Sequence, residues 1–127
     1  MNIKASHILI GKQGEREGIE YLEQSGYQIL EKNYRTRAGE IDCIAKHKDI
    51  LVFIEIKTRR SRQFGLPQEA VSIAKQRKII KSAKIYLQHK SYNQNLSIPI
   101  RFDVLAITLR EANRPTFELI QNAIELE

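Results

Sequence analysis

The sequence has a single cysteine and no long apolar run. Cys43 stands alone, which excludes an internal disulfide and argues against a zinc site built on thiolates. No stretch approaches the roughly 20 consecutive apolar residues that a membrane-spanning helix needs. The N-terminal sequence MNIKASHILIGKQGE lacks the long apolar segment and the cleavage site of a secretory signal. We therefore expect a cytoplasmic protein without a membrane partner.

The bulk composition is that of a globular protein with a basic surface. The chain has 127 residues, 42% of them hydrophobic and 28% charged, which suits one compact domain. The formal net charge of +6 favours polyanionic partners, nucleic acid before anionic membranes. We expect a single domain over 1–127, with an N-terminal extension at 1–11, a core at 12–108 and a C-terminal hairpin or tail at 109–127.

Apolar spacing predicts alternating blocks of helix and strand. We expect helices over 12–25 and 68–89, separated by polar turns. Strands are expected over 27–33, 40–45, 50–58 and 101–109. The segment 116–125 fits either a short strand or a helical tail. This α-β-β-β-α-β order predicts an α/β fold with at least one hairpin and one helical crossover.

The stretch LVFIEIKTRRSR, residues 51–62, begins as a core strand and ends as a basic run. Side chains along a strand alternate between its two faces. One face of this strand is entirely apolar and carries Val52, Ile54 and Ile56. The other face changes from apolar to charged at Glu55 and Lys57. The sequence therefore places a carboxylate and an ammonium group at the end of a core strand.

A second carboxylate is predicted to share that face. The short turn KHKD joins the strand at 40–45 to the strand at 50–58, so the two pair antiparallel. A loop of two or four residues places Asp42 opposite or diagonal to Glu55, within about 5–8 Å at Cβ. Two half-buried carboxylates repel each other and lose hydration. A hard cation such as Mg²⁺ or Mn²⁺ would relieve that repulsion, because it prefers carboxylate oxygens.

The chain resembles a known family in several motifs. These are GEREGIEYLEQSGYQIL, NYRTRAGEIDCIA, LVFIEIKTR, FGLPQEAVSIAKQRKI and RFDVLAI, which together span roughly 11–108. They resemble the bacterial YraN family, also called UPF0102. Asp42 followed by Glu-x-Lys at Glu55 resembles the active-site pattern of the PD-(D/E)xK nuclease superfamily, which includes the archaeal Holliday-junction resolvases. The residue before Asp42 is Ile41, so the proline of that pattern is absent.

This resemblance implies a fold and a set of site residues. The fold would be restriction-endonuclease-like, a mixed central sheet flanked by helices with an αβββαβ core. Asp42 and Glu55 would be ligands of Mg²⁺ or Mn²⁺, with the main-chain carbonyl of Ile56 as a third. Lys57 would be the catalytic lysine. Glu15 would complete the site from the first helix, as a helix glutamate does in the related junction resolvases.

Several of these residues also have structural interpretations. Glu15 could equally be a solvated residue of an acidic helix start. Glu40 shares the face of Asp42 and is an alternative participant, although an exposed strand start is the simpler interpretation. Gln76 matches the helix glutamine of some superfamily nucleases only weakly. Asp103 interrupts an apolar strand, for which a structural partner such as an arginine is expected.

Basic residues flank the predicted acidic site on both sides. A helix over 68–89 would be rich in lysine, and the turn near residue 36 and the end of the third strand carry arginines. The candidate nucleic-acid-binding residues are Arg35, Arg37, Arg59, Arg60, Arg62, Lys75 and Lys78. Such a distribution suits a phosphate backbone, DNA more than RNA. Junction resolvases act as dimers, so a homodimer is also considered.

Three functions remain open from the sequence. The first is a metal-dependent endonuclease that hydrolyses phosphodiester bonds in DNA. The second is a nucleic-acid-binding module with a vestigial nuclease site, which predicts salt-dependent binding without metal. The third is a protein–protein adaptor whose positive charge serves solubility. The pairing of carboxylates with basic residues favours the first two.

Overall fold

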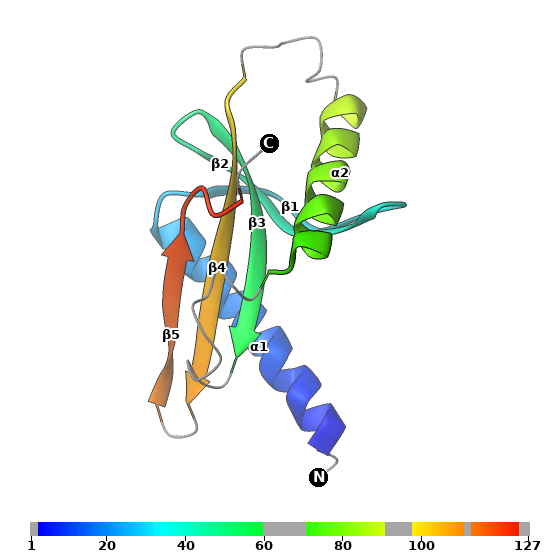
Figure 1. The fold of residues 1–127 in the computed structure, drawn as a ribbon. Helices are drawn as coiled ribbons and strands as arrows, with labels where there is room; N and C mark the ends of the chain where they lie inside the picture. Colours follow the sequence, from blue (N-terminus) through cyan, green and yellow to red (C-terminus); the bar gives the residue numbers. More distant parts are fainter. Residues whose placement is uncertain (1–2, 60–70, 91–97, 111–112, 125–127) are drawn as a thin grey trace.

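The computed structural model describes residues 3–59, 71–90, 98–110 and 113–124. Two helices and five strands make up the described chain (Figure 1). In chain order they are α1 (Ile3–Gln24), β1 (Gln28–Thr36), β2 (Gly39–His47), β3 (Ile50–Arg59), α2 (Ile73–His89), β4 (Ile100–Arg110) and β5 (Asn113–Ile120). Neither helix in these ranges is both long and apolar enough to cross a membrane.

The strands form one mixed sheet in the order β1-β2-β3-β4-β5. The β3–β4 pair is parallel and the other neighbours are antiparallel. The segment that contains α2 makes the crossover between the two parallel strands, as the parallel pairing requires. Helix α1 lies on one side of the sheet and α2 on the other (Figure 1). The expected α/β fold with its αβββαβ core is confirmed, with β5 added as an edge strand.

Some element boundaries differ from the sequence prediction. Helix α1 begins at Ile3, nine residues before the predicted start, so most of the expected extension at 1–11 is helical. Helix α2 begins at Ile73 because the Ser72 hydroxyl accepts the Lys75 N–H at 3.2 Å and caps the helix. Positions 68–70 of the expected helix lie outside the described residues. The C-terminal segment is a strand from Asn113, which replaces the alternative of a helical tail.

Two apolar layers confirm the predicted alternation of β3. Leu51 and Phe53 pack with residues of α2, including Ile79, Ala83 and Tyr86. The opposite face of β3, with Val52 and Ile54, packs with Leu22 of α1 and with Leu105 and Ile107 of β4. Both sets are almost completely buried. The sheet is therefore held rigidly between two cores at the level of the candidate site.

A two-residue turn joins β2 to β3. Lys48 and Asp49 both have positive φ, 50° and 66°, as in the type I′ turns that match the twist of a hairpin. The turn is shorter than the four residues expected, but it is also even in length. Cys43 consequently pairs with Ile54, and the register continued by one residue places Asp42 opposite Glu55.

Two glycines allow α1 to approach the sheet closely, and they tolerate alanine differently. A Cβ on Gly14 would meet Thr58 side-chain atoms at 3.5 Å, an ordinary contact. A Cβ on Gly18 would meet the buried Ile107 Cδ1 at 2.8 Å and Leu105 Cδ2 at 3.2 Å. We expect Gly14→Ala to raise the free energy of unfolding by up to about 1 kcal/mol through helix propensity. Gly18→Ala should lower it by about 1–2 kcal/mol through overpacking.

Urea denaturation of the two variants beside the wild type measures this difference. The two substitutions add the same methyl group to the same helix, so each serves as the control for the other. Equal effects of the two variants would contradict the close packing of α1 against β4.

A buried polar network ties the end of α1 to β4 and the C-terminal segment. Asp103, which is fully buried, forms an ion pair with Arg101 at 2.9 Å, as the sequence led us to expect. It also accepts hydrogen bonds from the Tyr27 hydroxyl at 2.8 Å and from the Asn122 N–H at 2.9 Å. The Tyr27 ring stacks on His47, with 4.3 Å between the ring centroids. Asp103 is thus a structural residue with a full set of partners.

Candidate active site

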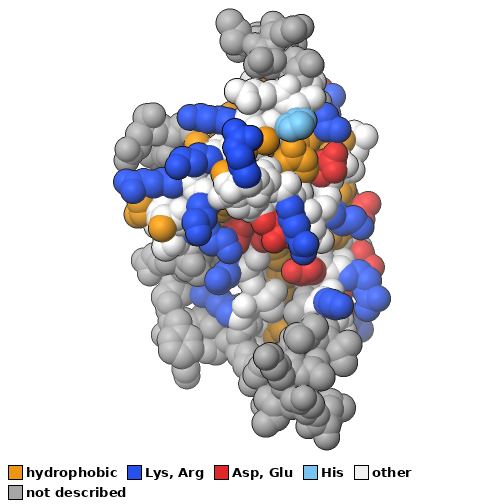
Figure 2. Space-filling model, turned by 90° about the vertical axis from the view of Figure 1, so that its right-hand side faces the viewer, with side chains coloured by type: hydrophobic (Ala, Val, Ile, Leu, Met, Phe, Trp, Pro, Cys, Tyr) orange, Lys and Arg blue, Asp and Glu red, His pale blue; other side chains and the backbone are white. Residues whose placement is uncertain are grey.

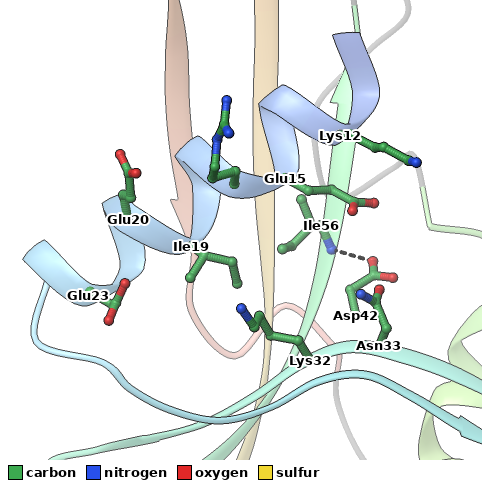
Figure 3. A pocket seen from close by; sticks show the side chains of 10 residues that line it. Lys12, Glu15, Ile19, Glu20, Glu23, Lys32, Asn33, Asp42 and Ile56 are labelled. Atoms are coloured by element: carbon green, nitrogen blue, oxygen red, sulfur yellow. Dashed lines mark hydrogen bonds between the residues drawn. The ribbon is translucent and has the colours of Figure 1, made fainter. Parts of the chain in front are cut away.

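Asp42 lies where β2 and β3 separate. The backbone pairing of β2 with β3 runs from the turn to Cys43 and Ile54 and ends there. Beyond it, the Ile56 N–H donates to Asp42 Oδ2 at 2.8 Å, so a side chain replaces the next backbone partner (Figure 3). The N–H and C=O of one strand residue point to the same side. The Ile56 carbonyl therefore faces the same gap as the Asp42 carboxylate.

Glu55 is the buried acidic residue of this gap. Its side chain is only 3% exposed, and Glu55 Oε1 forms an ion pair with Lys75 Nζ at 2.8 Å. The Lys75 side chain is 48% exposed, so the pair joins a buried carboxylate to a half-solvated ammonium. Lys75 reaches Glu55 from the first turn of α2, where the Ser72 cap fixes its backbone.

The two carboxylates affect each other electrostatically. Burial, and after it the neighbouring negative charge of Glu55, together raise the pKa of Asp42 from 3.8 to about 7. The Ile56 N–H and the Lys75 ammonium oppose this rise in pKa. At neutral pH the surrounding groups therefore do not fully stabilise negative charge on both Asp42 and Glu55.

Asp42 opens onto a hollow on each side of the sheet. The α1-side hollow, about 570 Å³, is lined by Glu15, Ile19, Lys32, Asn33, Asp42, Ile56 and four further residues of α1. The α2-side hollow, about 460 Å³, is lined by Gly39, Glu40, Asp42, Glu55, Ser72, Ala74, Lys75, Lys78 and Ile79. Among the described residues, Asp42 is the one that lines both. Asp42 therefore borders both the hollow beside α1, which carries Glu15, and the hollow beside α2, which carries Lys75.

Glu15 and Asn33 border the same space as Asp42. Figure 3 shows Glu15 on α1 above the Asp42 carboxylate and Asn33 beside it. Asn33 was not identified from the sequence. It has a positive φ of 52°, a left-handed conformation that asparagine tolerates better than most residues. Glu15 is exposed. It lines the same hollow as Asp42, but it does not form a compact cluster of carboxylates with Asp42 and Glu55.

The donor set suits a hard divalent cation only in part. Within the described ranges, no three His, Cys, Asp or Glu side chains converge as a ready-made metal site. Asp42, Glu55 and the Ile56 carbonyl supply oxygen ligands of the type that Mg²⁺ and Mn²⁺ prefer. The raised pKa of Asp42 adds an electrostatic reason for a cation there. These residues fit such an ion with water or substrate oxygens as the remaining ligands.

The other residues predicted for catalysis have different surroundings. Lys57 follows Glu55 by one pleat on β3 and is partly buried. The lysines described in the hollow beside Glu55 are Lys75 and Lys78. Gln76 donates through its side chain to the Val71 carbonyl at 3.0 Å, so it supports the start of α2. Glu40 is exposed and forms an ion pair with Arg35 at 3.7 Å. This agrees with the interpretation of Glu40 as an exposed residue at the start of a strand.

Basic side chains surround the acidic centre on the α2 side. Figure 2 shows Lys and Arg side chains around a small acidic patch on this face. Arg35 and Arg37 flank Thr36 at the tip of the β1–β2 hairpin, and the Thr36 hydroxyl lies 2.9 Å from the Ser82 hydroxyl of α2. This contact fixes the hairpin against the helix that carries Lys75 and Lys78. Arg59 ends β3 and is partly buried, whereas Arg60 and Arg62 lie outside the described residues.

Comparison with known proteins connects this site to a family. A family model described as "Uncharacterised protein family UPF0102" matches residues 14–107. A UPF0102 protein of Syntrophus aciditrophicus is 51% identical over 94% of this chain and 91% of its own length. UPF0102 proteins of Trichlorobacter lovleyi and Geobacter sulfurreducens are each 43% identical, over 92% and 93% of this chain and 91% and 90% of their own lengths. The matched range includes Asp42, Glu55 and Lys75.

Proposed function

Given that this chain belongs to the UPF0102 family, we propose that it is a metal-dependent nuclease that hydrolyses phosphodiester bonds in DNA. The observation that carries the proposal is the pairing of Asp42 with the buried Glu55 at the point where β2 and β3 separate. Asp42 is held there by the Ile56 N–H at 2.8 Å, and its pKa is raised to about 7. A buried pair of carboxylates that is only partly neutralised is suited to a cation.

The residues have separate roles in this proposal. Asp42, Glu55 and the Ile56 carbonyl would hold Mg²⁺ or Mn²⁺, and Glu15, which lines the α1-side hollow together with Asp42, would approach the cation from that side. A cation held there would supply Lewis acidity and favour the ionisation of a water molecule, the nucleophile of phosphodiester hydrolysis. Lys57, one pleat beyond Glu55, orients the attacking water or offsets the charge that develops on the phosphate. The rigid sheet keeps these groups in place, since both of its faces are packed.

The basic surface suits the backbone of DNA. Arg35, Arg37, Lys75 and Lys78 come from two elements that the Thr36–Ser82 contact joins. A phosphate backbone that follows these cations passes over the α2-side hollow and so over Glu55. Each phosphate that they neutralise releases counterions, so binding should weaken steeply with salt.

Cleavage assays on isosteric variants test the proposal. Purified protein is incubated with duplex, single-stranded and branched DNA in Mg²⁺ or Mn²⁺. We expect cleavage by the wild type, none in EDTA, and loss of cleavage in Asp42→Asn and in Glu55→Gln. Glu40→Gln removes an exposed carboxylate from the same hollow and serves as the matched control. Cleavage by Asp42→Asn as fast as by the wild type would refute the assignment.

A second candidate is a nucleic-acid-binding protein that does not cleave. The observation that favours it is the 2.8 Å ion pair of Lys75 with Glu55, which partly neutralises the centre without a metal. It predicts DNA binding that is unchanged by EDTA and by Asp42→Asn but weakened by salt. Binding with these properties, together with no cleavage of any substrate, would favour this candidate over the nuclease.

A further inference from the structure

The two members of the Lys75–Glu55 ion pair differ in how much the charge of each depends on the other for stabilisation. Glu55 is 3% exposed, so without a partner it would be an uncompensated buried charge. Lys75 is 48% exposed and its ammonium group has water as an alternative partner. Separating the pair is therefore unfavourable chiefly for the carboxylate. Another cation at Glu55 would remove that disadvantage.

The backbone of α2 does not have to move for this separation. Lys75 N–H is bound by the Ser72 hydroxyl at 3.2 Å, and the Gln76 N–H by the Ser72 carbonyl at 2.9 Å. The Gln76 side chain adds a third contact to the Val71 carbonyl at 3.0 Å. The first turn of α2 is thus fixed, while the long side chain of Lys75 reaches across the α2-side hollow. Rotation of that side chain alone breaks the ion pair.

We propose that Lys75 is an exchangeable counter-ion, which holds Glu55 in the metal-free protein and competes with a divalent cation for it. This inference rests on the proposed function, because it concerns the same two carboxylates. Lys75 limits the repulsion between Asp42 and Glu55 and so lets the acidic centre fold without a metal. The same contact weakens the affinity of the centre for a cation.

Once it has left Glu55, Lys75 also adds to the positive charge that attracts phosphate in the same hollow. Its ammonium group would join Lys78, which lines the hollow one turn further along α2. Two lysines that line this hollow attract a phosphate group more strongly than one. The counter-ion of the metal-free centre therefore becomes part of the surface for the polyanion. Metal affinity and DNA affinity are coupled through this one side chain.

Calorimetric titration with Mn²⁺ at about pH 8, where free carboxylates are ionised, tests the competition directly. We expect Lys75→Met to bind Mn²⁺ on the order of tenfold more tightly than the wild type, because the competing charge is gone. Lys75→Arg keeps the charge and should not bind more tightly. Lys78→Met removes a charge from the same hollow but leaves the ion pair, so its affinity should stay within about twofold of the wild type. Lys75→Gln repeats the test if the methionine variant does not fold.

Each outcome separates this inference from the proposed function. Equal or weaker Mn²⁺ binding by Lys75→Met, beside clear binding by the wild type, would overturn the competition and leave the metal site in place. An equal gain in Lys78→Met would also overturn it, since any lost charge would then suffice. Absence of Mn²⁺ binding in every protein, with and without DNA, would refute the metal site and this inference together.

Discussion

Replacing Asp103 by alanine should lower the free energy of unfolding by about 3–5 kcal/mol, the range for breaking a buried ion pair. Asp103 is fully buried and accepts hydrogen bonds on both carboxylate oxygens. Its loss leaves the guanidinium of Arg101, whose side chain is only 14% exposed, without its ionic partner. The Tyr27 hydroxyl and the Asn122 N–H also lose their acceptor. Urea denaturation followed by circular dichroism measures the change.

A double variant separates the ion pair from the burial of its members. Asp103→Leu combined with Arg101→Met removes both charges and leaves apolar side chains of similar size. We expect this double variant to be more stable than Asp103→Ala, since no charge remains buried alone. A double variant as unstable as the single one would mean that packing, rather than charge, dominates at this position.

Asp42→Asn should stabilise the metal-free protein at alkaline pH. The pKa of Asp42 is raised from 3.8 to about 7, so between these values the folded protein binds a proton that the unfolded chain has released. The stability of the wild type should therefore fall as the pH rises from about 4 to about 7 and then level off. Asparagine has no charge to gain and can still accept the Ile56 N–H. We expect a gain of about 1–3 kcal/mol at about pH 8.

The pH dependence distinguishes this effect from a general change in packing. Unfolding of both proteins is measured in EDTA at about pH 5 and about pH 8. The advantage of Asp42→Asn should be larger at the higher pH, where the wild-type carboxylate is ionised. An advantage that does not change with pH, or a variant that is less stable at pH 8, would contradict the raised pKa.

The position of Asp42 beside Glu55 was predictable because it depends only on whether the number of residues in the hairpin turn is even or odd. A hairpin turn of even length fixes which residues of β2 and β3 share a face, whatever the details of the turn. The arginine partner of Asp103 was predictable too, since a charge inside an apolar strand needs compensation. Both inferences rest on strand alternation and on the high free energy of an unpaired buried charge.

The ion pair of Lys75 with Glu55 was not predictable in the same way. It depends on how α2 is placed over β2 and β3 after a long crossover, and on where the helix begins. The residues QEAV favour helix, so the sequence placed the start at 68, whereas the described helix starts after the Ser72 cap. The place of Asn33 depends on a left-handed residue in β1, which no periodicity reveals.

The two-residue turn between β2 and β3 also bears on the order in which the chain folds. Asp42 and Glu55 belong to one meander of neighbouring strands, whose contacts close short loops and form early. Strand β4 pairs with β3 only after the whole crossover has been closed, which is entropically more demanding. The two carboxylates are thus brought together by the local part of the topology. We therefore expect Asp42 and Glu55 to become neighbours in the hairpin first, and their repulsion to become costly only when β4 and the helices bury them.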